Sequence, residues 1–340
     1  MHHASHHQPN NQSQVLIHGN ATAAEAKDLT QLILSKIPFN TLPHSQVPIR
    51  RLVRLKEGTT YLYRQHAANA NPNEVNSATE NIYMVGQSHG SSSSSSSDDD
   101  DDDDAVEVEE EDGSCSTSTS IEKLLSKDDI VNEASLELLV HMISEPAFDQ
   151  LRTKEQLGYI VYSAIKRLNS QYLALHIIVQ SSHKDPDYLD QRIESFLVQY
   201  RQQLAAMAPE EYQAYVQAVI EKLVEKPKNL NEETEAYWHE IKSAMFWFPR
   251  RHVLAKVLRS EAFSTSAHVL EFFDRFIAAT ASTSSSSSSS RIKFSSQFYG
   301  KSCRYVKAQS VQPQQVVVVH DPSLFKRSMP LDPVPVYTPL

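Results

Sequence analysis

The sequence has 340 residues, of which 40% are hydrophobic and 22% are charged, enough for about two folded domains with apolar cores. The formal net charge is −10, but residues 98–112 contain twelve acidic residues and no basic one. The rest of the chain is therefore close to neutral. This balance argues against a nucleic-acid-binding protein and against a polybasic membrane-binding one.

Cysteine content and hydropathy point to a cytoplasmic (cytosolic) protein. The only cysteines are Cys115 and Cys303, so a disulfide framework of the secreted kind is not expected. No apolar run reaches the ~18 residues of a membrane span. The His-rich start, residues 1–12, lacks the apolar core of a signal peptide and is expected to be disordered.

Residues 13–87 predict part of an α/β sandwich. A short β-rich run at 14–18 predicts a strand, and residues 21–37 have the apolar spacing of a helix. Further strands joined by turns are predicted over 51–55, 60–63 and 81–85.

A Ser-rich and acidic segment, residues 88–126, follows and contains the aspartate run Asp98–Asp104. Such a composition buries too little apolar area to offset the entropy of ordering, so we expect a disordered insert. The aspartates could attract calcium, basic proteins or polyamines by charge alone, but a solvated linker is the default interpretation.

Residues 127–330 predict a second region. A helix is expected from Asp128 or Asp129 to near Pro146, followed by antiparallel strands over 158–164 and 172–179. Further helices are predicted over 187–206, 209–225, 231–247 and 263–278. A serine loop at 282–290 precedes a strand over 291–299, and residues 331–340 predict an extended Pro-rich tail. Two strands, several helices and a returning strand indicate an α+β fold.

Residues 143–162, ISEPAFDQLRTKEQLGYIVY, closely resemble the fourth domain of the insulinase/pitrilysin-type zinc metallopeptidases, the family of insulin-degrading enzyme (insulysin). Further matching segments are LIHGNAT (16–22), EKPKNL (225–230), YWHEI (237–241) and FKRSMPL (325–331). The resemblance implies the carboxy-terminal half of such an enzyme. Residues 13–87 would be an incomplete third domain and 127–330 the fourth, each an antiparallel-rich sheet packed with helices.

Members of this family enclose a peptide between two bowl-like halves and hold zinc in their first domain through an HxxEH motif. This sequence has neither HxxEH nor HExxH, and its nearest imitation, His239-Glu240, lacks the second histidine. The resemblance therefore implies that this chain binds no metal or cofactor and that the zinc belongs to an absent amino-terminal half. A histidine cluster at the start could bind a transition metal adventitiously, and comprises His2, His3, His6 and His7.

The resemblance assigns two auxiliary catalytic residues, Arg152 and Tyr159. In the family pattern RTKEQLGY, this arginine and tyrosine project into the chamber, where they contact the substrate backbone and help to stabilise the oxyanion. Guanidinium and phenol groups suit these tasks because both donate hydrogen bonds. The alternative is an Arg152–Glu155 salt bridge and a Tyr159 that only packs a strand. With the motif intact, we favour the substrate-facing role.

Neighbouring residues are given structural roles. Gly158 is expected to adopt positive φ or to allow a close approach of two chain segments. Lys154, Glu155 and Gln156 are expected on a helix surface or at a domain contact. A group of aromatic residues is interpreted as core packing rather than as a peptide-binding wall, and consists of Tyr237, Trp238, Phe246, Trp247 and Phe248.

Three functions remain open at this stage. The leading hypothesis is the carboxy-terminal part of a zinc metalloendopeptidase, a gene fragment or a separately encoded half, inactive alone and acting on peptides with a zinc-bearing partner half. The second is a noncatalytic peptide-binding or regulatory subunit that assembles with an intact peptidase. The third is a degraded scaffold without peptide contacts.

Overall fold

The structure is a computed structural model, and it describes residues 15–36, 51–66, 73–86, 127–168, 172–243, 245–279, 291–301, 303 and 315–332. The His-rich start, the Ser-rich and acidic insert with Cys115, the serine loop and the tail beyond Asp332 lie outside the described residues. None of the helices within these ranges is both long and apolar enough to cross a lipid bilayer.

The helices are α1 (Ala23–Lys36), α3 (Lys127–Phe148), the π-helix η3 (Asp149–Lys154), α4 (Pro186–Ala205), α5 (Pro209–Val224), α6 (Leu230–Lys242), α7 (Arg250–Leu258), the short 3-10 helix η4 (Glu261–Phe263), α8 (Ala267–Phe276) and α9 (Pro322–Ser328). The strands are β1 (Thr59–His66), β2 (Ser77–Val85), β3 (Ile160–Arg167), β4 (Leu173–Ser181), β5 (Ile292–Tyr299) and β6 (Gln315–Val319).

All six strands form one mixed sheet in the order β3-β4-β2-β5-β1-β6. The first four are antiparallel neighbours, whereas β1 is parallel to both β5 and β6. This arrangement confirms the predicted α+β fold with an antiparallel-rich sheet. β1 and β2 lie in the same sheet as the strands of 127–330, so the predicted division between 13–87 and 127–330 does not separate two sheets.

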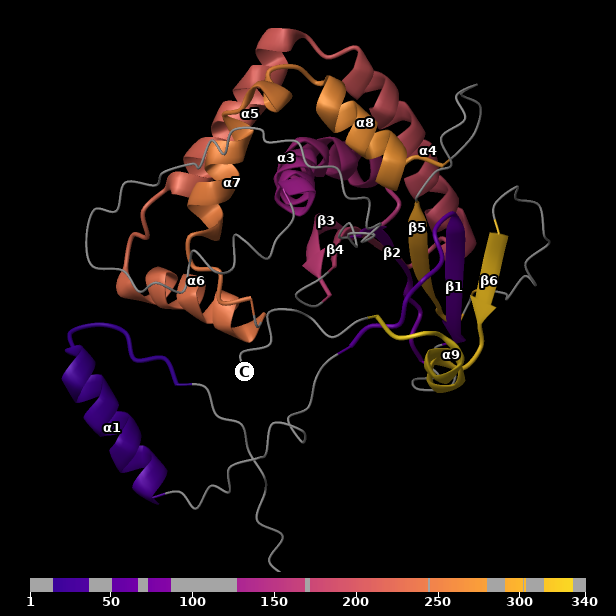
Figure 1. Ribbon diagram of the computed structural model, residues 1–340. Coiled ribbons are helices and arrows are strands. Elements are labelled where there is room, and N and C mark those ends of the chain that lie inside the picture. Colours follow the sequence, from indigo (N-terminus) through magenta and orange to yellow (C-terminus); the bar gives the residue numbers. More distant parts are fainter. Residues whose placement is uncertain are drawn as a thin grey trace, which may run out of the picture.

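Helices cover one face of this sheet (Figure 1). α3 packs on β3, and α4 packs on β2 and β5, while α5 and α7 lie against α3 on the outer side. α4 begins cleanly because Asp185 accepts a hydrogen bond from the backbone N–H of Tyr188 at 2.9 Å and Pro186 occupies the first turn. Its apolar stripe is buried in the main core, and consists of Leu189, Ile193, Phe196, Leu197, Tyr200 and Leu204. Each such side chain contributes about 1.5–3 kcal/mol by burial.

The opposite face of the sheet is covered only in part. Near the β6 side, residues 52–55 and α9 pack over a smaller cluster that includes Ile82, Met84 and Ala174. Farther along the same face, toward the edge strand β3, Ile160 and Tyr162 remain 43% and 56% exposed. This uncovered part continues directly from the segment that carries the candidate site.

The amino-terminal region differs from expectation. The strand predicted at 14–18 is wrong, because residues 15–18 are irregular and the His18 ring instead bonds to the Thr234 hydroxyl of α6 at 2.8 Å. The strand predicted at 51–55 is reduced to one bridge between Val53 and Leu331. The helix predicted over 21–37 is present as α1, although none of its side chains is buried.

α3 ends at Phe148, near Pro146 as predicted, and passes directly into η3. The predicted end of another helix is wrong, and two α-helices and one strand were not predicted. α6 ends at Lys242 rather than 247 because Phe246 adopts a φ of 52° and Trp247 turns into a buried cluster of its own. The unpredicted elements are α7, β6 and α9.

Candidate functional site

The segment that carries Arg152 is a π-helix that two buried leucines anchor. The N–H of Glu155 donates to the carbonyl of Gln150 at 3.0 Å, the five-residue spacing of a π-turn, and the N–H of Leu157 donates to the carbonyl of Leu151 at 3.1 Å. Leu151 and Leu157 are 0% and 2% exposed. The wider turn fixes Arg152 between these anchors, and π-turns are frequent at functional sites.

Gly158 joins this turn to β3 at a point where two backbones nearly touch. A Cβ on Gly158 would lie 1.7 Å from the carbonyl oxygen of Gln180 in β4. The expected close chain approach is therefore confirmed, whereas positive φ belongs to the neighbouring Gln156, at 51°. Only glycine fits this position without a backbone shift, so Gly158 determines where Tyr159 emerges.

Arg152 lies between two aromatic rings. Its guanidinium carbon is 4.7 Å from the centroid of the Phe148 ring and 4.8 Å from that of Tyr159. Cation–π contacts at exposed sites contribute about 0.5–1 kcal/mol each. These contacts restrict the guanidinium, and it makes no ion pair with the described residues that would compete with an acceptor from a ligand.

The alternative salt bridge is not formed. Glu155 binds Arg192 instead, through N–O contacts of 2.6 and 2.7 Å, and also accepts from the Gln150 amide at 2.8 Å. The hydrogen bonds from Arg192 lower the pKa of Glu155, which secures its negative charge. Within the described residues, Arg152 makes no ion pair.

Tyr159 does not pack the strand, because 82% of it is exposed. Phe148 beside it is 41% exposed, and Lys154 pairs with Asp149 at 2.8 Å on the surface. The structure therefore brings the two predicted residues together on one surface and adds Phe148, which the sequence analysis did not single out. Its position one turn before Arg152 on a helical segment was the available signal.

The described residues offer no metal site. Among them, no group of three or more His, Cys, Asp or Glu could hold an ion. In His239-Glu240, the pair most similar to a zinc motif, Glu240 is buried and accepts a hydrogen bond from the Arg250 guanidinium at 2.8 Å. Burial and the nearby Arg250 charge lower the pKa of His239.

The aromatic group was predicted to pack the core, and only Trp247 is fully buried. Tyr237, Trp238 and Phe248 are 36%, 44% and 48% exposed. Their exposure leaves a small aromatic surface on and after α6, where the Tyr237 and Phe248 rings meet edge-on at 5.9 Å.

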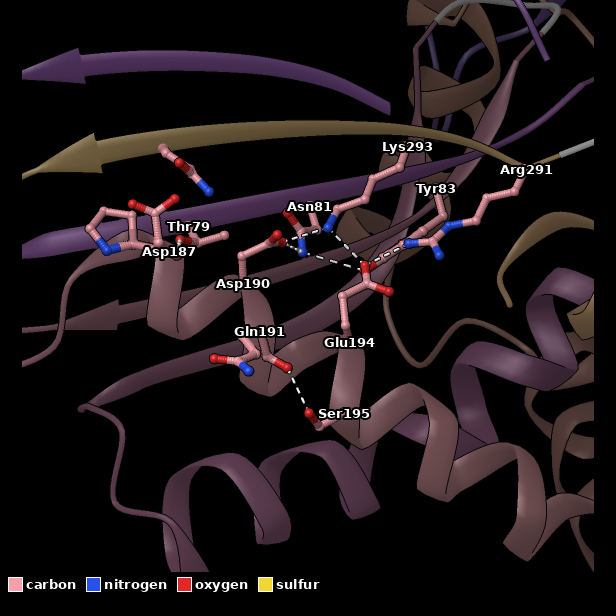
Figure 2. A network of polar contacts seen from close by, with 12 residues as sticks. Thr79, Asn81, Tyr83, Asp187, Asp190, Gln191, Glu194, Ser195, Arg291 and Lys293 are labelled. Atoms are coloured by element: carbon pink, nitrogen blue, oxygen red, sulfur yellow. Dashed lines mark hydrogen bonds and ion pairs between the residues drawn. The ribbon is translucent and has the colours of Figure 1, made fainter. Parts of the chain in front are cut away.

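A buried polar network between α4 and the sheet was missed entirely (Figure 2). Lys293 of β5 lies 2.6 Å from Asp190 and 2.7 Å from Glu194 of α4, and Glu194 also accepts from Arg291 at 2.5 Å. Asn81 of β2 donates to Asp190 at 2.6 Å. The acidic residues recur at Asp187, Asp190 and Glu194, a helical spacing that places them on one face and was the signal available in the sequence.

The network replaces apolar packing where α4 crosses the centre of the sheet. Lys293 is only 4% exposed. Burial disfavours the charge of Glu194, but Lys293 and Arg291 outweigh it and lower the pKa of Glu194 to about 2. All partners come from strands or a long helix, so this network fixes the angle of α4 rather than forming a reactive site.

Comparisons with known proteins agree with this architecture. Residues 138–238, which contain Arg152 and Tyr159, match the family described as PQQ synthase PqqF-like, C-terminal lobe domain 4. The chain is 34% identical over 205 residues to the insulin-degrading enzyme of Mus musculus, an alignment that covers 58% of this chain and 20% of the mouse protein. These matches support an insulinase-type C-terminal region. The chain spans about a fifth of the mouse relative's length.

Other members of the insulinase family extend the match over more of the chain. The peroxisomal insulin-degrading enzyme-like 1 of Arabidopsis thaliana is 28% identical over 291 residues, 84% of this chain and 24% of the plant protein. The crystal structure of pitrilysin superposes with a TM-score of 0.64 over 93% of this chain and 27% of pitrilysin, at 19% identity. The fold is therefore that of an insulinase-type C-terminal region.

Proposed function

We propose that this chain supplies one wall of the peptide-binding chamber of an insulinase-type metalloendopeptidase. Arg152 would bind carbonyl oxygens of the substrate backbone, and Tyr159 would donate to the oxyanion that develops during hydrolysis. The hydrolytic zinc centre would come from an amino-terminal half. The observation that carries the proposal is a half-buried Arg152 whose guanidinium lies over two aromatic rings, beside an 82% exposed Tyr159.

The geometry supports this role on physical grounds. A guanidinium held between two rings has lost much of its rotational freedom before a ligand binds, so less entropy is lost on binding. An enclosed chamber would strengthen each hydrogen bond of the guanidinium, because hydrogen bonds to charged groups are stronger where water is excluded. Neither side chain can activate water on its own, so hydrolysis by this chain alone is not expected.

Fluorescence anisotropy with a labelled, extended 20-residue peptide tests the binding part. We expect Arg152→Ala to weaken binding to the purified chain about tenfold, since hydrogen bonds to charged groups contribute about 1.5–3 kcal/mol. The control is Arg275→Ala, because Arg275 of α8 also lies over a ring, that of Phe276, at 4.8 Å. Equal effects of both variants would contradict the proposal.

Mixing the chain with a zinc-bearing amino-terminal half of the family tests the catalytic part. Peptide cleavage should require both halves and should be abolished by a chelator. Tyr159→Phe should lower kcat by about 100- to 1000-fold, the range for loss of one oxyanion donor, with little change in KM. An unchanged kcat would leave Tyr159 without the proposed role. Peptide binding without any cleavage in the mixture would favour the alternative of a noncatalytic peptide-binding subunit.

A further inference from the structure

Three ionisable side chains meet on the sheet face that the helices leave uncovered. Glu80 comes from β2, His176 from β4 and Lys166 from β3. One carboxylate oxygen of Glu80 lies 2.8 Å from His176 Nε2 and accepts from the Lys166 ammonium as well. We call Glu80, His176 and Lys166 the open-face triad.

The open-face triad remains accessible. Its side chains are 29%, 12% and 37% exposed for Glu80, His176 and Lys166, so the ammonium is the most accessible of the three groups. Hydrogen bonds from His176 and Lys166 lower the pKa of Glu80 to about 2, which keeps its carboxylate charged. An ammonium has three donors, and the Glu80 contact occupies one of them.

Strand alternation places the triad lysine on the same face as the exposed side chains of β3. Ile160, Tyr162, Ala164 and Lys166 lie on the same face of β3, because side chains two apart in a strand point the same way. The Tyr162 ring meets the His176 ring edge-on at 6.3 Å. Tyr159 immediately precedes Ile160 in the chain, so a strip with the exposed side chains of Ile160 and Tyr162 lies along β3 between the candidate site and Lys166.

The charges along this strip favour an acidic ligand. Arg152 lies at one end with no ion pair among the described residues, and the Lys166 ammonium lies at the other. Glu80 is already shared between two donors, which reduces its capacity to attract a cation. At ~3.3 Å per residue, an extended peptide lying along β3 spans Tyr159 to Lys166 with about seven residues.

We propose that Lys166 forms a substrate subsite for an aspartate or glutamate side chain located about seven residues from the peptide unit held by Arg152 and Tyr159. This inference rests on the proposed function, because the same extended peptide occupies both places. The apolar residues between would lie over Ile160 and Tyr162. The insulinase-type C-terminal region would then select substrates by charge at a distance from the cleaved bond.

The test uses sets of three labelled 20-residue peptides that carry Glu, Gln or Lys at one position and are otherwise identical. Successive sets move this position along the peptide. When it lies opposite Lys166, the full chain should bind the Glu peptide about threefold more tightly than the Gln peptide, the size expected of an accessible ion pair. The Lys peptide should bind more weakly than either. The preference should shrink between 50 and 500 mM salt.

Variants assign the preference to one side chain. Lys166→Met should abolish the difference between the Glu and Gln peptides, whereas Glu80→Gln should keep or enlarge it because the ammonium is no longer shared. Lys154→Met is the control, since Lys154 is a surface lysine paired with Asp149. Urea midpoints of the three variants verify that each is folded.

The outcomes separate this inference from the proposed function. Binding that depends on Arg152 but shows no Glu preference, or a preference that survives Lys166→Met, overturns the subsite and leaves the proposed function intact. A Lys166-dependent preference together with an unaffected Arg152→Ala variant keeps the subsite for acidic peptides and overturns the placement of the substrate backbone at Arg152. Failure of every peptide to bind overturns both.

Discussion

The guanidinium carbon of Arg152 lies 4.8 Å from the centroid of the Tyr159 ring, although Arg152 belongs to a π-helix and Tyr159 immediately precedes an edge strand. Two backbone features produce this contact. The π-turn rotates Arg152 toward the sheet, and the close approach of Gly158 to β4 sets the point where the chain enters β3. The site therefore depends on backbone geometry as much as on the identity of its two side chains.

Gly158→Ala should damage both stability and peptide binding. The new Cβ would lie 1.7 Å from the Gln180 carbonyl oxygen, so β3 must shift, and we expect a loss on the order of 3 kcal/mol. Urea unfolding measures this loss, and anisotropy should show peptide binding weakened as in Arg152→Ala. The matched control is Gly86→Ala, where the nearest atom to a new Cβ is a Tyr172 ring carbon at 3.8 Å. Equal stability of the two variants would contradict the proposed role of Gly158.

The residue pattern predicted those elements whose signal is local. Runs rich in Ile, Val, Tyr and Leu identified β3 and β4, and the Pro186 start with its apolar stripe identified α4. α7 was not predicted because it begins with the polar residues Arg250–His252 and buries only a few apolar side chains. β6 was also missed, although its run of four valines is typical of a strand. The position of β1 beside β5 depends on long-range pairing, which no local pattern encodes.

The candidate site was predicted from family resemblance rather than from residue chemistry. Nothing local in RTKEQLGY distinguishes Arg152 from an ordinary surface arginine, and composition alone favoured a salt bridge with Glu155. In the structure, Glu155 forms its salt bridge with Arg192 instead of Arg152. Phe148, the second ring over Arg152, was missed although its spacing of four residues from Arg152 on a helical segment was an available signal. The network around Lys293 was missed because it joins strands and a helix far apart in sequence.

Glu133 and Glu137 lie one turn apart on α3, and replacing each with glutamine should change the free energy of unfolding in opposite directions. Glu133 accepts from Arg167 and Arg250 at 2.6 Å each, and these charges outweigh burial and lower its pKa. Burial raises the pKa of Glu137, whose nearest cationic group is Arg250 at 3.7 Å. Glu133→Gln should cost about 3–5 kcal/mol because it leaves two buried guanidinium groups underpaired.

Glu137→Gln should instead stabilise the protein at pH 7 by about 1 kcal/mol, because it removes a buried, weakly compensated charge. A carboxyl whose folded pKa is raised favours folding below its unfolded pKa, and this contribution is lost as pH rises through the folded pKa. The gain from Glu137→Gln should therefore be larger at pH 7 than at pH 4. Urea unfolding at both pH values measures it, and destabilisation at pH 7 would contradict the interpretation.

Lys293→Met should be strongly destabilising. Its ammonium separates Asp190 and Glu194 at 2.6 and 2.7 Å and is 4% exposed. Methionine has a similar length but no charge, so two partly buried carboxylates would lose a common partner at a cost of about 3–5 kcal/mol. Lys228→Met, at an exposed pair with Glu225, should leave the urea midpoint nearly unchanged, because exposed ion pairs contribute little to stability. Similar urea midpoints for the two variants would contradict a structural role of the network.

Acid unfolding should depend on Glu194. Its pKa is about 2 in the folded protein, below the usual 4.5, because the attraction of Lys293 and Arg291 exceeds the penalty of burial. Ionised Glu194 therefore stabilises the folded state above about pH 4.5, and this contribution, on the order of 3 kcal/mol, is lost as pH falls toward 2. Glu194→Gln should lower stability at pH 6 and flatten the dependence of the unfolding free energy on pH between 4.5 and 2.5. Part of the slope should remain, because the pKa values of Glu80 and Glu133 are also lowered. Urea titrations across this range measure the slope, and one identical to that of the wild type would mean that α4 is held on the sheet without the charge of Glu194.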